Sequence, residues 1–271
     1  MEIRNRVALV TGGAHRVGKS IALALAAAGA HTVITYLHAA GEAARTSREI
    51  EAHSVQGLAL RLDQREPAQI AALLDAVRER FGRLDILVNS AAIMERRPIF
   101  DITPEDWDRT LDTNLRGPFF VAQSAARLML ENKPGAARLT GGELHGVEAH
   151  ALHEGGGAQD AAGCIVNISD LAALRPWPSY VAHSVSKAGL VALSRALAAA
   201  LAPSIRVNAI APGAVLRPPD WSNERWARLS RSAPLGRPGT PDDVAQAVMY
   251  LVRSEFITGQ LLVLDGGREL R

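Results

Sequence analysis

Three side chains that can move or hold a proton lie close together in the stretch SYVAHSVSKAGL, residues 179–190. Ser179 is a good N-cap residue, and the alanines, valines and leucines after it predict a helix that begins near Tyr180. At about 100° per residue, Tyr180, His183 and Lys187 fall within about 60° of one another on such a helix. One stripe would then carry a phenol, an imidazole and an ammonium group, which are typical of general acid–base catalysis.

A glycine-rich turn, TGGAHRVGKSIA at residues 11–22, separates the first predicted strand from a helix. Gly12, Gly13 and Gly18 would let the backbone approach a pyrophosphate, whose charge a helix N-terminus attracts. Such turns also form for purely steric reasons. The turn alone therefore leaves a nucleotide site and a plain tight turn as alternatives.

The end of the second predicted strand indicates which nucleotide would fit. No Asp or Glu lies next to Tyr36 to accept hydrogen bonds from a ribose 2′-hydroxyl. His15, Arg16 and His38 instead offer donors or positive charge, which favours a 2′-phosphate and hence NADP(H) over NAD(H). A solvent-facing loop of mixed polarity is the alternative.

The scaffold for these groups follows from the alternation of short β-rich runs with alanine-rich helical stretches, which is typical of a parallel sheet covered on both faces. Strands are expected at residues 7–11, 31–36, 57–62, 84–89, 164–169, 205–210 and 260–265, with helices such as 19–29 and 67–82 between them. We therefore predict an α/β fold with a Rossmann-type, doubly wound, seven-stranded parallel sheet and helices on both faces. The whole chain, residues 1–271, is expected to form a single domain.

One connection, residues 132–163, is far longer than the roughly 2–6 residues usual between such elements, so we interpret it as an insertion. Its histidines and glutamates could be drawn as a metal site: His145, His150, His153, Glu143, Glu148 and Glu154. Neither a cysteine nor an HExxH pattern supports one, so we predict no metal. A helix-to-strand connection lies at the amino-terminal edge of a parallel sheet, so the insertion is expected to face away from the ligand site.

Composition narrows the class of protein. The 271 residues are 48% hydrophobic and carry a formal charge of +2, which gives no field that would favour nucleic acid or an anionic membrane. No apolar run approaches the ~18 residues of a membrane span, and the start MEIRNRVALVTGG leads directly into a strand, so a cytoplasmic location is expected. The single cysteine, Cys164, lies in an apolar run that predicts a buried thiol.

Taken together, the ordered motifs resemble those of the short-chain dehydrogenase/reductase family. They are TGGAHRVG at 11–18, Asp63, NSAA at 89–92, Asn114 in DTNLRGPFF, NIS at 167–169, HSVSK at 183–187, RVNAIAPG at 206–213 and LDGG at 264–267. The match covers nearly the whole chain except the insertion. Arg16 stands where a third glycine is usual and Asp170 where the catalytic serine is usual, and with Tyr180 they resemble the pteridine reductases.

The resemblance implies an oxidoreductase that binds NADPH and is commonly a homotetramer. For the cofactor it implies that the pyrophosphate is held by Gly12, Arg16, Val17 and Gly18, the adenine by Asp63 and Gln64, the nicotinamide half by Asn89, Ser90, Ala91 and Lys187, and the nicotinamide amide by Pro212 and Gly213. For catalysis it implies that Asn114 places a water in a proton relay. For the substrate it implies contacts from Arg16, Met94, Asp170, Tyr180 and Trp221, under a lid that runs from residue 215 to 232.

Three departures from the family pattern bear on the chemistry. The family's general acid is a tyrosine four residues before the lysine, and this chain has His183 there. An unperturbed imidazole has a pKa of about 6.5, against about 10 for a phenol. Lys187 should disfavour an imidazolium and Asp170 should favour it. Met94 replaces an aromatic that stacks on the pterin, and Ala92 replaces a polar hydroxyl residue.

The function expected from the sequence is therefore NADPH-dependent reduction of a pteridine C=N bond, with His183 as proton donor, recharged through Asp170, Lys187 and water. Tyr180 is the alternative donor. A carbonyl reductase on the same scaffold is a second reading, favoured by Met94. A third is a catalytically inactive NADP-binding protein in which the insertion is a partner surface.

Overall fold

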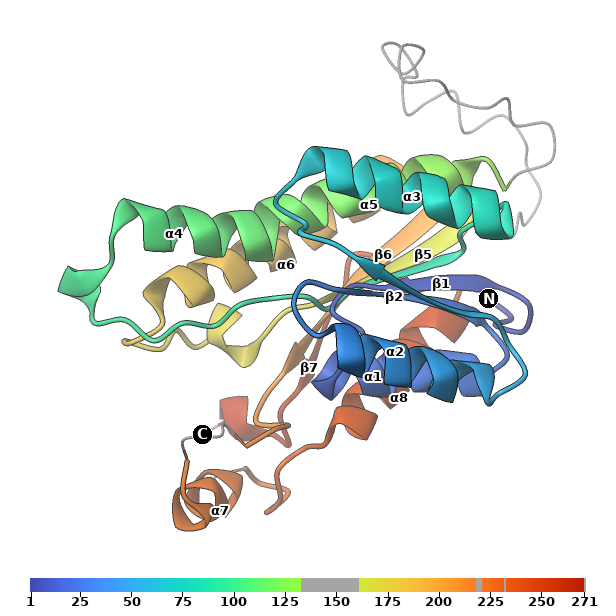
Figure 1. Cartoon of the computed structure of the whole chain (residues 1–271). Helices are drawn as coiled ribbons and strands as arrows, with labels where there is room; N and C mark the ends of the chain where they lie inside the picture. Colours follow the sequence, from blue (N-terminus) through green and yellow to red (C-terminus); the bar gives the residue numbers. More distant parts are fainter. Residues whose placement is uncertain (133–160, 218–220, 232, 271) are drawn as a thin grey trace.

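The fold is seen in a computed structural model that describes residues 1–132, 161–217, 221–231 and 233–270 (Figure 1). Within these ranges, seven strands form one all-parallel sheet of order β3-β2-β1-β4-β5-β6-β7. They are β1 Val7–Val10, β2 His31–Tyr36, β3 Gly57–Arg61, β4 Ile86–Asn89, β5 Gly163–Ile168, β6 Ile205–Pro212 and β7 Leu261–Leu264. The predicted doubly wound parallel sheet is confirmed, and its strand bounds differ from the expected ones by at most two residues.

Helices cover both faces of the sheet, as predicted (Figure 1). One face carries α1 Arg16–Ala27, α2 Ala40–Glu51 and α8 Pro241–Arg253, and the other carries α3 Pro67–Phe81, α5 Gly117–Leu130 and α6 Val181–Leu201. The remaining helices, α4 Pro104–Leu111 and α7 Asn223–Arg231, lie on the side of the sheet away from the N-terminus (Figure 1).

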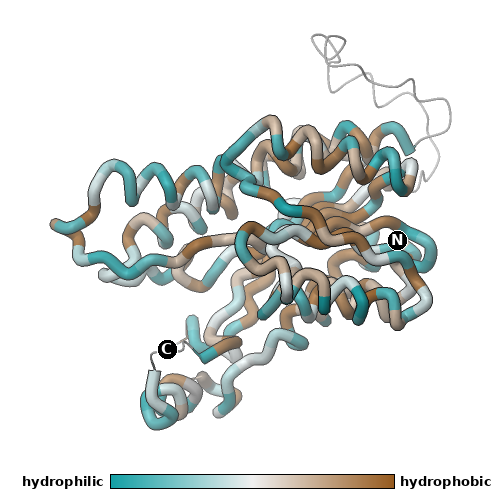
Figure 2. Tube along the Cα trace, in the orientation of Figure 1, coloured by the Kyte–Doolittle hydropathy of each residue, from teal (hydrophilic) through white to brown (hydrophobic). Residues whose placement is uncertain are grey.

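Alternating side chains of each strand build two separate cores. Val7 and Leu9 of β1 pack in the core beneath α3 and α5, whereas Ala8 and Val10 pack against α1 and α8. Successive residues of a strand point to opposite faces, so a sheet covered on both sides needs apolar residues at every position. Figure 2 shows the result, with hydrophobic chain through the middle and hydrophilic residues on the outer faces of the helices.

Helix α6 begins at Val181, close to the expected start near Tyr180, but its N-cap differs from the expectation. Tyr180, not Ser179, is the N-cap residue, and its side chain makes no capping hydrogen bond. A turn determines this start: the Tyr180 amide donates to the Trp177 carbonyl at 2.9 Å, and the Trp177 amide donates to Ser184 Oγ at 3.3 Å. Tyr180 therefore precedes the helical stripe, while His183 and Lys187 lie one turn apart on the buried face of α6.

The long connection joins the fold at the amino-terminal edge of the sheet. Asn132, just after α5, donates from Nδ2 to the carbonyls of Leu84 at 2.6 Å and Ala162 at 3.3 Å. Leu84 precedes β4 and Ala162 precedes β5, so the connection leaves and returns at the edge opposite the strands' carboxyl ends. The histidines and glutamates considered for a metal site lie at 143–154, outside the described residues.

Two features bear on the expected class of protein. Among the described helices, α6 alone is long and apolar enough to cross a membrane, but its buried face packs against the sheet as a core helix. Cys164 lies in β5 with no exposed surface, as expected, and burial raises the pKa of its thiol. The described residues hold no group of three or more His, Cys, Asp or Glu side chains that could bind a metal ion.

Candidate active site

The predicted site residues gather where the sheet order reverses. The chain runs outward from β1 through β2 to β3, and outward from β4 through β5 to β7, so the crevice at the carboxyl ends of β1 and β4 is the switch point at which such sheets bind ligands. Gly12 follows β1 with φ +66°, and a Cβ on it would lie 2.9 Å from Ala91 Cα after β4. Only glycine permits this close approach.

The turn after β1 leaves a helix N-terminus open to an anion. Thr11 Oγ1 accepts from the amides of Ser90 at 3.0 Å and Ala91 at 3.1 Å, which ties the turn to the end of β4. The N-cap of α1, His15, makes no side-chain capping bond, and the first turn of α1 holds no acidic residue. Free amides and the positive end of the helix dipole therefore fit a pyrophosphate.

The residues expected around the adenine half of the cofactor differ in whether their side chains are exposed or already paired. Exposed His15, Arg16 and His38 provide donors near the carboxyl end of β2, where Tyr36 is the last strand residue. Asp63 is paired with Arg65, whose guanidinium lowers the pKa of that carboxyl.

Gln64 and Asn89 turn their side chains inward. Gln64 is buried and donates from Nε2 to the carbonyls of Thr113 at 2.5 Å and Ala91 at 3.3 Å. Asn89 donates to Asn167 Oδ1 at 2.9 Å, within the core. The side chains of both residues brace the crevice from behind, so neither side chain is turned toward the predicted cofactor site. Pro212 ends β6, and a Cβ on Gly213 would lie 2.9 Å from Asp265 Cβ.

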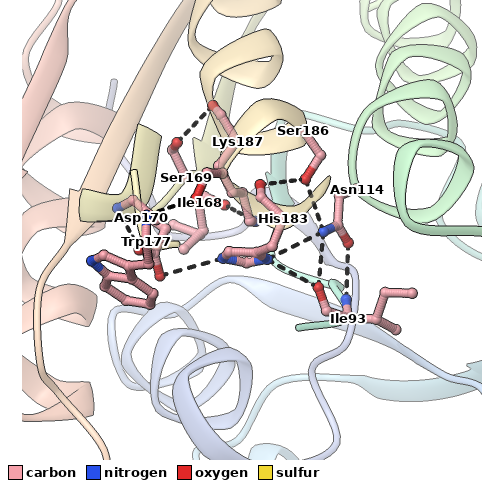
Figure 3. Close-up of polar contacts among 11 residues, drawn as sticks. Ile93, Asn114, Ile168, Ser169, Asp170, Trp177, His183, Ser186 and Lys187 are labelled. Atoms are coloured by element: carbon pink, nitrogen blue, oxygen red, sulfur yellow. Dashed lines mark hydrogen bonds and ion pairs between the residues drawn. The ribbon is translucent and has the colours of Figure 1, made fainter. Parts of the chain in front are cut away.

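Lys187 is a buried lysine on α6. Its Nζ donates to the Ile168 carbonyl at 2.8 Å, and its exposed surface is 4% (Figure 3). Burial lowers the pKa of Lys187 to about 8, and the nearby Asp170 carboxylate partly opposes this effect. The side chain is therefore a cation at neutral pH in a place where a cation is costly.

The ring of His183 is held by one nitrogen and offers the other. Nδ1 lies 3.1 Å from the Ile93 carbonyl, and because a carbonyl only accepts, Nδ1 carries the hydrogen. Nε2 is buried, has no hydrogen-bond partner among the described residues and lies 3.8 Å from Asp170 Oδ2 (Figure 3). The other oxygen of Asp170 accepts from the Ala172 amide at 2.7 Å. A substrate atom that bonds to Nε2 would therefore also lie close to Asp170 Oδ2.

Asn114 completes the cluster from a different element. It lies in η2, a π-helical turn at Asp112–Arg116 between α4 and α5, and such turns are frequent at functional sites. Its Oδ1 accepts from the Ile93 amide at 2.9 Å, and its Nδ2 donates to the Ile93 carbonyl at 2.8 Å and to Ser186 Oγ at 3.1 Å. The motifs predicted Asn114 but missed Ile93, which acts through its backbone, and Ser186.

Comparison with known proteins identifies the family. A family model described as short chain dehydrogenase matches residues 6–137, and one described as enoyl-(acyl carrier protein) reductase matches residues 143–269. The chain is 33% identical to galactitol 2-dehydrogenase of Agrobacterium fabrum, covering 98% of both chains, and 31% identical to a 3-oxoacyl-(acyl-carrier-protein) reductase of Thermotoga maritima, covering 98% and 99%. The crystal structure of a putative short-chain alcohol dehydrogenase from Sinorhizobium meliloti superposes with a TM-score of 0.83 at 34% identity, covering 98% of this chain and 97% of that one.

The chain belongs to the short-chain dehydrogenase/reductase family. It is therefore an oxidoreductase with a nicotinamide cofactor, NAD or NADP. The expected pteridine reductase subgroup does not appear among these relatives, which are named as dehydrogenases of polyols and reductases of ketoacyl groups.

The substrate side of this short-chain dehydrogenase/reductase is assembled only in part. Tyr180 packs edge-on against Trp177, with ring centroids 5.7 Å apart, and Met94 is 47% exposed after β4. Trp221 stacks with the Arg225 guanidinium, which lies 3.8 Å from its ring centroid. Residues 218–220 and 232 of the expected lid lie outside the described ranges. A cavity of about 240 Å³ beside α7 is lined by Leu229, Ala214 and Asp265 among others, and by none of the predicted catalytic residues.

Arg16 is strained at the place where the family pattern has a glycine. Its φ of +54° lies in the left-handed region, which costs a residue with a Cβ about 1 kcal/mol or more. We expect Arg16→Gly to raise the free energy of unfolding by roughly 0.5–1 kcal/mol, measured by urea denaturation. Arg16→Ala is the control, because it removes the guanidinium and keeps the Cβ. An equal gain in Arg16→Ala would show that strain is not the cause.

Lys187→Met should stabilise the protein at pH 7, by roughly 2 kcal/mol after subtraction of the lost hydrogen bond to Ile168. The pKa of Lys187 is about 8 when folded and 10.5 normally, so the unfolded chain holds the proton more tightly. The penalty is therefore complete below pH 8 and is relieved as the pH rises to 10.5. The stability difference between variant and wild type should shrink across that interval. Lys19→Met, at a partly exposed lysine paired with Glu49, should show no such trend, and a constant difference for Lys187→Met would contradict the assignment.

Proposed function

We propose that this protein is an NADPH-preferring reductase that converts a carbonyl group to a hydroxyl group, and can run in reverse, with His183 as the proton donor. The observation that carries the proposal is the buried Nε2 of His183, which has no partner among the described residues and faces Asp170 at 3.8 Å. Polar atoms buried without a partner are rare, and one aimed at a second ionisable group in a ligand crevice favours a proton-transfer role.

The proton path follows from the contacts of the ring. A bound nicotinamide would supply the hydride to the carbonyl carbon, and the electron pair of the C=O bond would move onto the oxygen. The imidazolium form of His183 donates its Nε2 proton to that oxygen and becomes the neutral ring, in which Nδ1 keeps its hydrogen on the Ile93 carbonyl. Lys187 adds positive charge beside the developing oxyanion and would hold the ribose hydroxyls of the cofactor. In the oxidative direction, Nε2 accepts the hydroxyl proton.

The choice of a carbonyl substrate is supported by relatives whose names state hydroxyl or keto chemistry, galactitol 2-dehydrogenase and 3-oxoacyl-(acyl-carrier-protein) reductase. Reduction of a pteridine C=N bond is a second candidate, favoured by the Asp170 carboxylate. A carboxylate can accept hydrogen bonds from the ring N–H groups of a pterin, which a simple ketone lacks. Exposed Met94 offers a pterin less stacking than an aromatic ring would.

We expect His183→Ala to lose about 10²–10⁴-fold in kcat and to bind NADPH as tightly as wild type, because the ring acts on the proton and not on the cofactor. His183→Tyr is the informative partner: since a phenol keeps its proton to higher pH than an imidazole, reduction by this variant should persist to higher pH than reduction by wild type. Steady-state NADPH oxidation with ketones, 3-oxoacyl thioesters, dihydrobiopterin and dihydrofolate measures both and ranks the substrates. Unchanged turnover in His183→Ala would contradict the donor role. NADPH binding without turnover on any substrate would favour the inactive-protein reading.

The cofactor preference can be tested separately by binding. We expect NADPH to bind more tightly than NADH, and Arg16→Ala to weaken NADPH binding about 10-fold while leaving NADH nearly unchanged, because a charge-assisted contact to a 2′-phosphate is lost. Fluorescence titration of both cofactors against both proteins measures this. An equal loss for both cofactors would place Arg16 at the pyrophosphate instead.

A further inference from the structure

The Ile93 peptide is held at both of its polar atoms by one side chain. Asn114 Oδ1 accepts from the Ile93 amide at 2.9 Å, and Asn114 Nδ2 donates to the Ile93 carbonyl at 2.8 Å (Figure 3). An amide N–H only donates and a carbonyl only accepts, so this pairing fixes which end of the Asn114 amide is oxygen. Ile93 lies in the stretch 90–98, which has no helix or strand hydrogen bonds to orient it.

The same carbonyl decides where the hydrogen of His183 sits. A carbonyl oxygen has two lone pairs, and at Ile93 one faces Asn114 Nδ2 while the other faces His183 Nδ1 at 3.1 Å. The opposite tautomer would set the Nδ1 lone pair against the carbonyl oxygen. It would leave the buried Nδ1 unsatisfied, at a cost of about 1–3 kcal/mol, and would leave the carbonyl with only its hydrogen bond from Asn114.

Asn114 cannot itself satisfy that opposite tautomer. Its Nδ2 lies 3.5 Å from His183 Nδ1, but both of its hydrogens are committed, to the Ile93 carbonyl and to Ser186 Oγ at 3.1 Å. Ser186 Oγ in turn donates to the His183 carbonyl at 2.7 Å, which closes the cluster. The only bond open to Nδ1 within this cluster is therefore donation to Ile93.

We propose that Asn114 is a positioning residue that fixes His183 as the Nδ1–H tautomer by clamping the Ile93 peptide, so that Nε2 alone exchanges a proton with the substrate. The proposal rests on the proposed donor role of His183 for its catalytic consequence. The tautomer itself is a property of the ligand-free protein. An imidazole needs this control because it has two nitrogens that can carry the hydrogen, whereas a phenol has one oxygen.

The direct test is the ¹⁵N NMR spectrum of the protein labelled at histidine, without cofactor or substrate, at a pH where His183 is neutral. The eight histidines are distinguished by comparison with His183→Phe, which lacks only the signal of interest. We expect a protonated Nδ1 and a bare Nε2 in wild type, and an averaged pattern in Asn114→Leu, where the Ile93 peptide is released. Asn132→Leu is the matched control, because it removes a partly buried amide at the opposite edge of the sheet and should leave the His183 pattern unchanged.

Asn114→Asp keeps the acceptor for the Ile93 amide and loses the donors to the carbonyl and to Ser186, so the protein stays folded if the acceptor alone suffices. We expect Nδ1 to stay protonated there, because a carboxylate oxygen in the place of Asn114 Nδ2, which lies 3.5 Å from His183 Nδ1, can accept from Nδ1–H. A protonated Nε2 in wild type, or an unchanged Nδ1–H pattern in Asn114→Leu, would overturn the proposal.

Kinetics separate this proposal from the proposed function. Release of the ring should lower kcat about 10-fold or more in Asn114→Leu while NADPH affinity stays within about twofold, because none of the predicted cofactor contacts comes from the Asn114 side chain. If His183→Ala keeps full turnover while the tautomer shifts as expected, the donor role is wrong and the positioning role stands. If His183→Ala is inactive and Asn114→Leu keeps both the Nδ1–H tautomer and kcat, the donor role stands and the positioning role is wrong.

Discussion

The close approach of two backbone segments at the centre of the sheet is the constraint on which the site depends. Gly12 after β1 packs on Ala91 after β4 at a distance that excludes a Cβ, and Thr11 fastens the two segments with two hydrogen bonds. This contact exists because β1 and β4 are neighbours in the sheet, although 75 residues lie between the end of β1 at Val10 and the start of β4 at Ile86. The contact sets the position of the crevice, which lies between the open N-terminus of α1 and the segment that carries Ile93 toward α6.

The buried polar side chains at the bottom of the crevice lower the stability of the fold. Lys187 and His183 are both buried, and each has one well-formed hydrogen bond, to a backbone carbonyl. A buried polar network with few partners is costly, and it persists only where rigid elements hold it in place. Here β5, α6 and the π-turn supply that rigidity. Arg16, strained at the mouth of the same crevice, follows the same pattern of local cost at a site residue.

The sequence predicted the scaffold well because a sheet buried on both faces requires continuous apolar runs, such as Val7–Val10, and these are visible without a structure. The start of α6 near Tyr180 was predicted to within one residue, but the N-cap was wrongly assigned to Ser179, because a turn from Trp177 to Tyr180 and not a serine side chain determines it. Motif positions identified Gln64 and Asn89 but not the direction of their side chains, which depends on partners such as Asn167 that lie far away in the chain. Ile93 could not be found at all, since its role belongs to a carbonyl that every residue has.

With His183 as the proposed proton donor, an imidazole in place of a phenol changes what the surroundings of the donor must do. A phenol presents one oxygen, and a nearby lysine can shift its pKa. An imidazole has two nitrogens, so its surroundings must also determine which of them carries the hydrogen. In this protein the Ile93 carbonyl faces Nδ1 and favours the hydrogen there. Ile93 lies in the segment after β4, whose position the tight contact at Gly12 already fixes. Asp170 then faces the remaining nitrogen, in the position where the family pattern has a neutral hydroxyl. The two departures at 170 and 183 therefore meet in one geometry, with a carboxylate oxygen 3.8 Å from the Nε2 that we propose exchanges the proton.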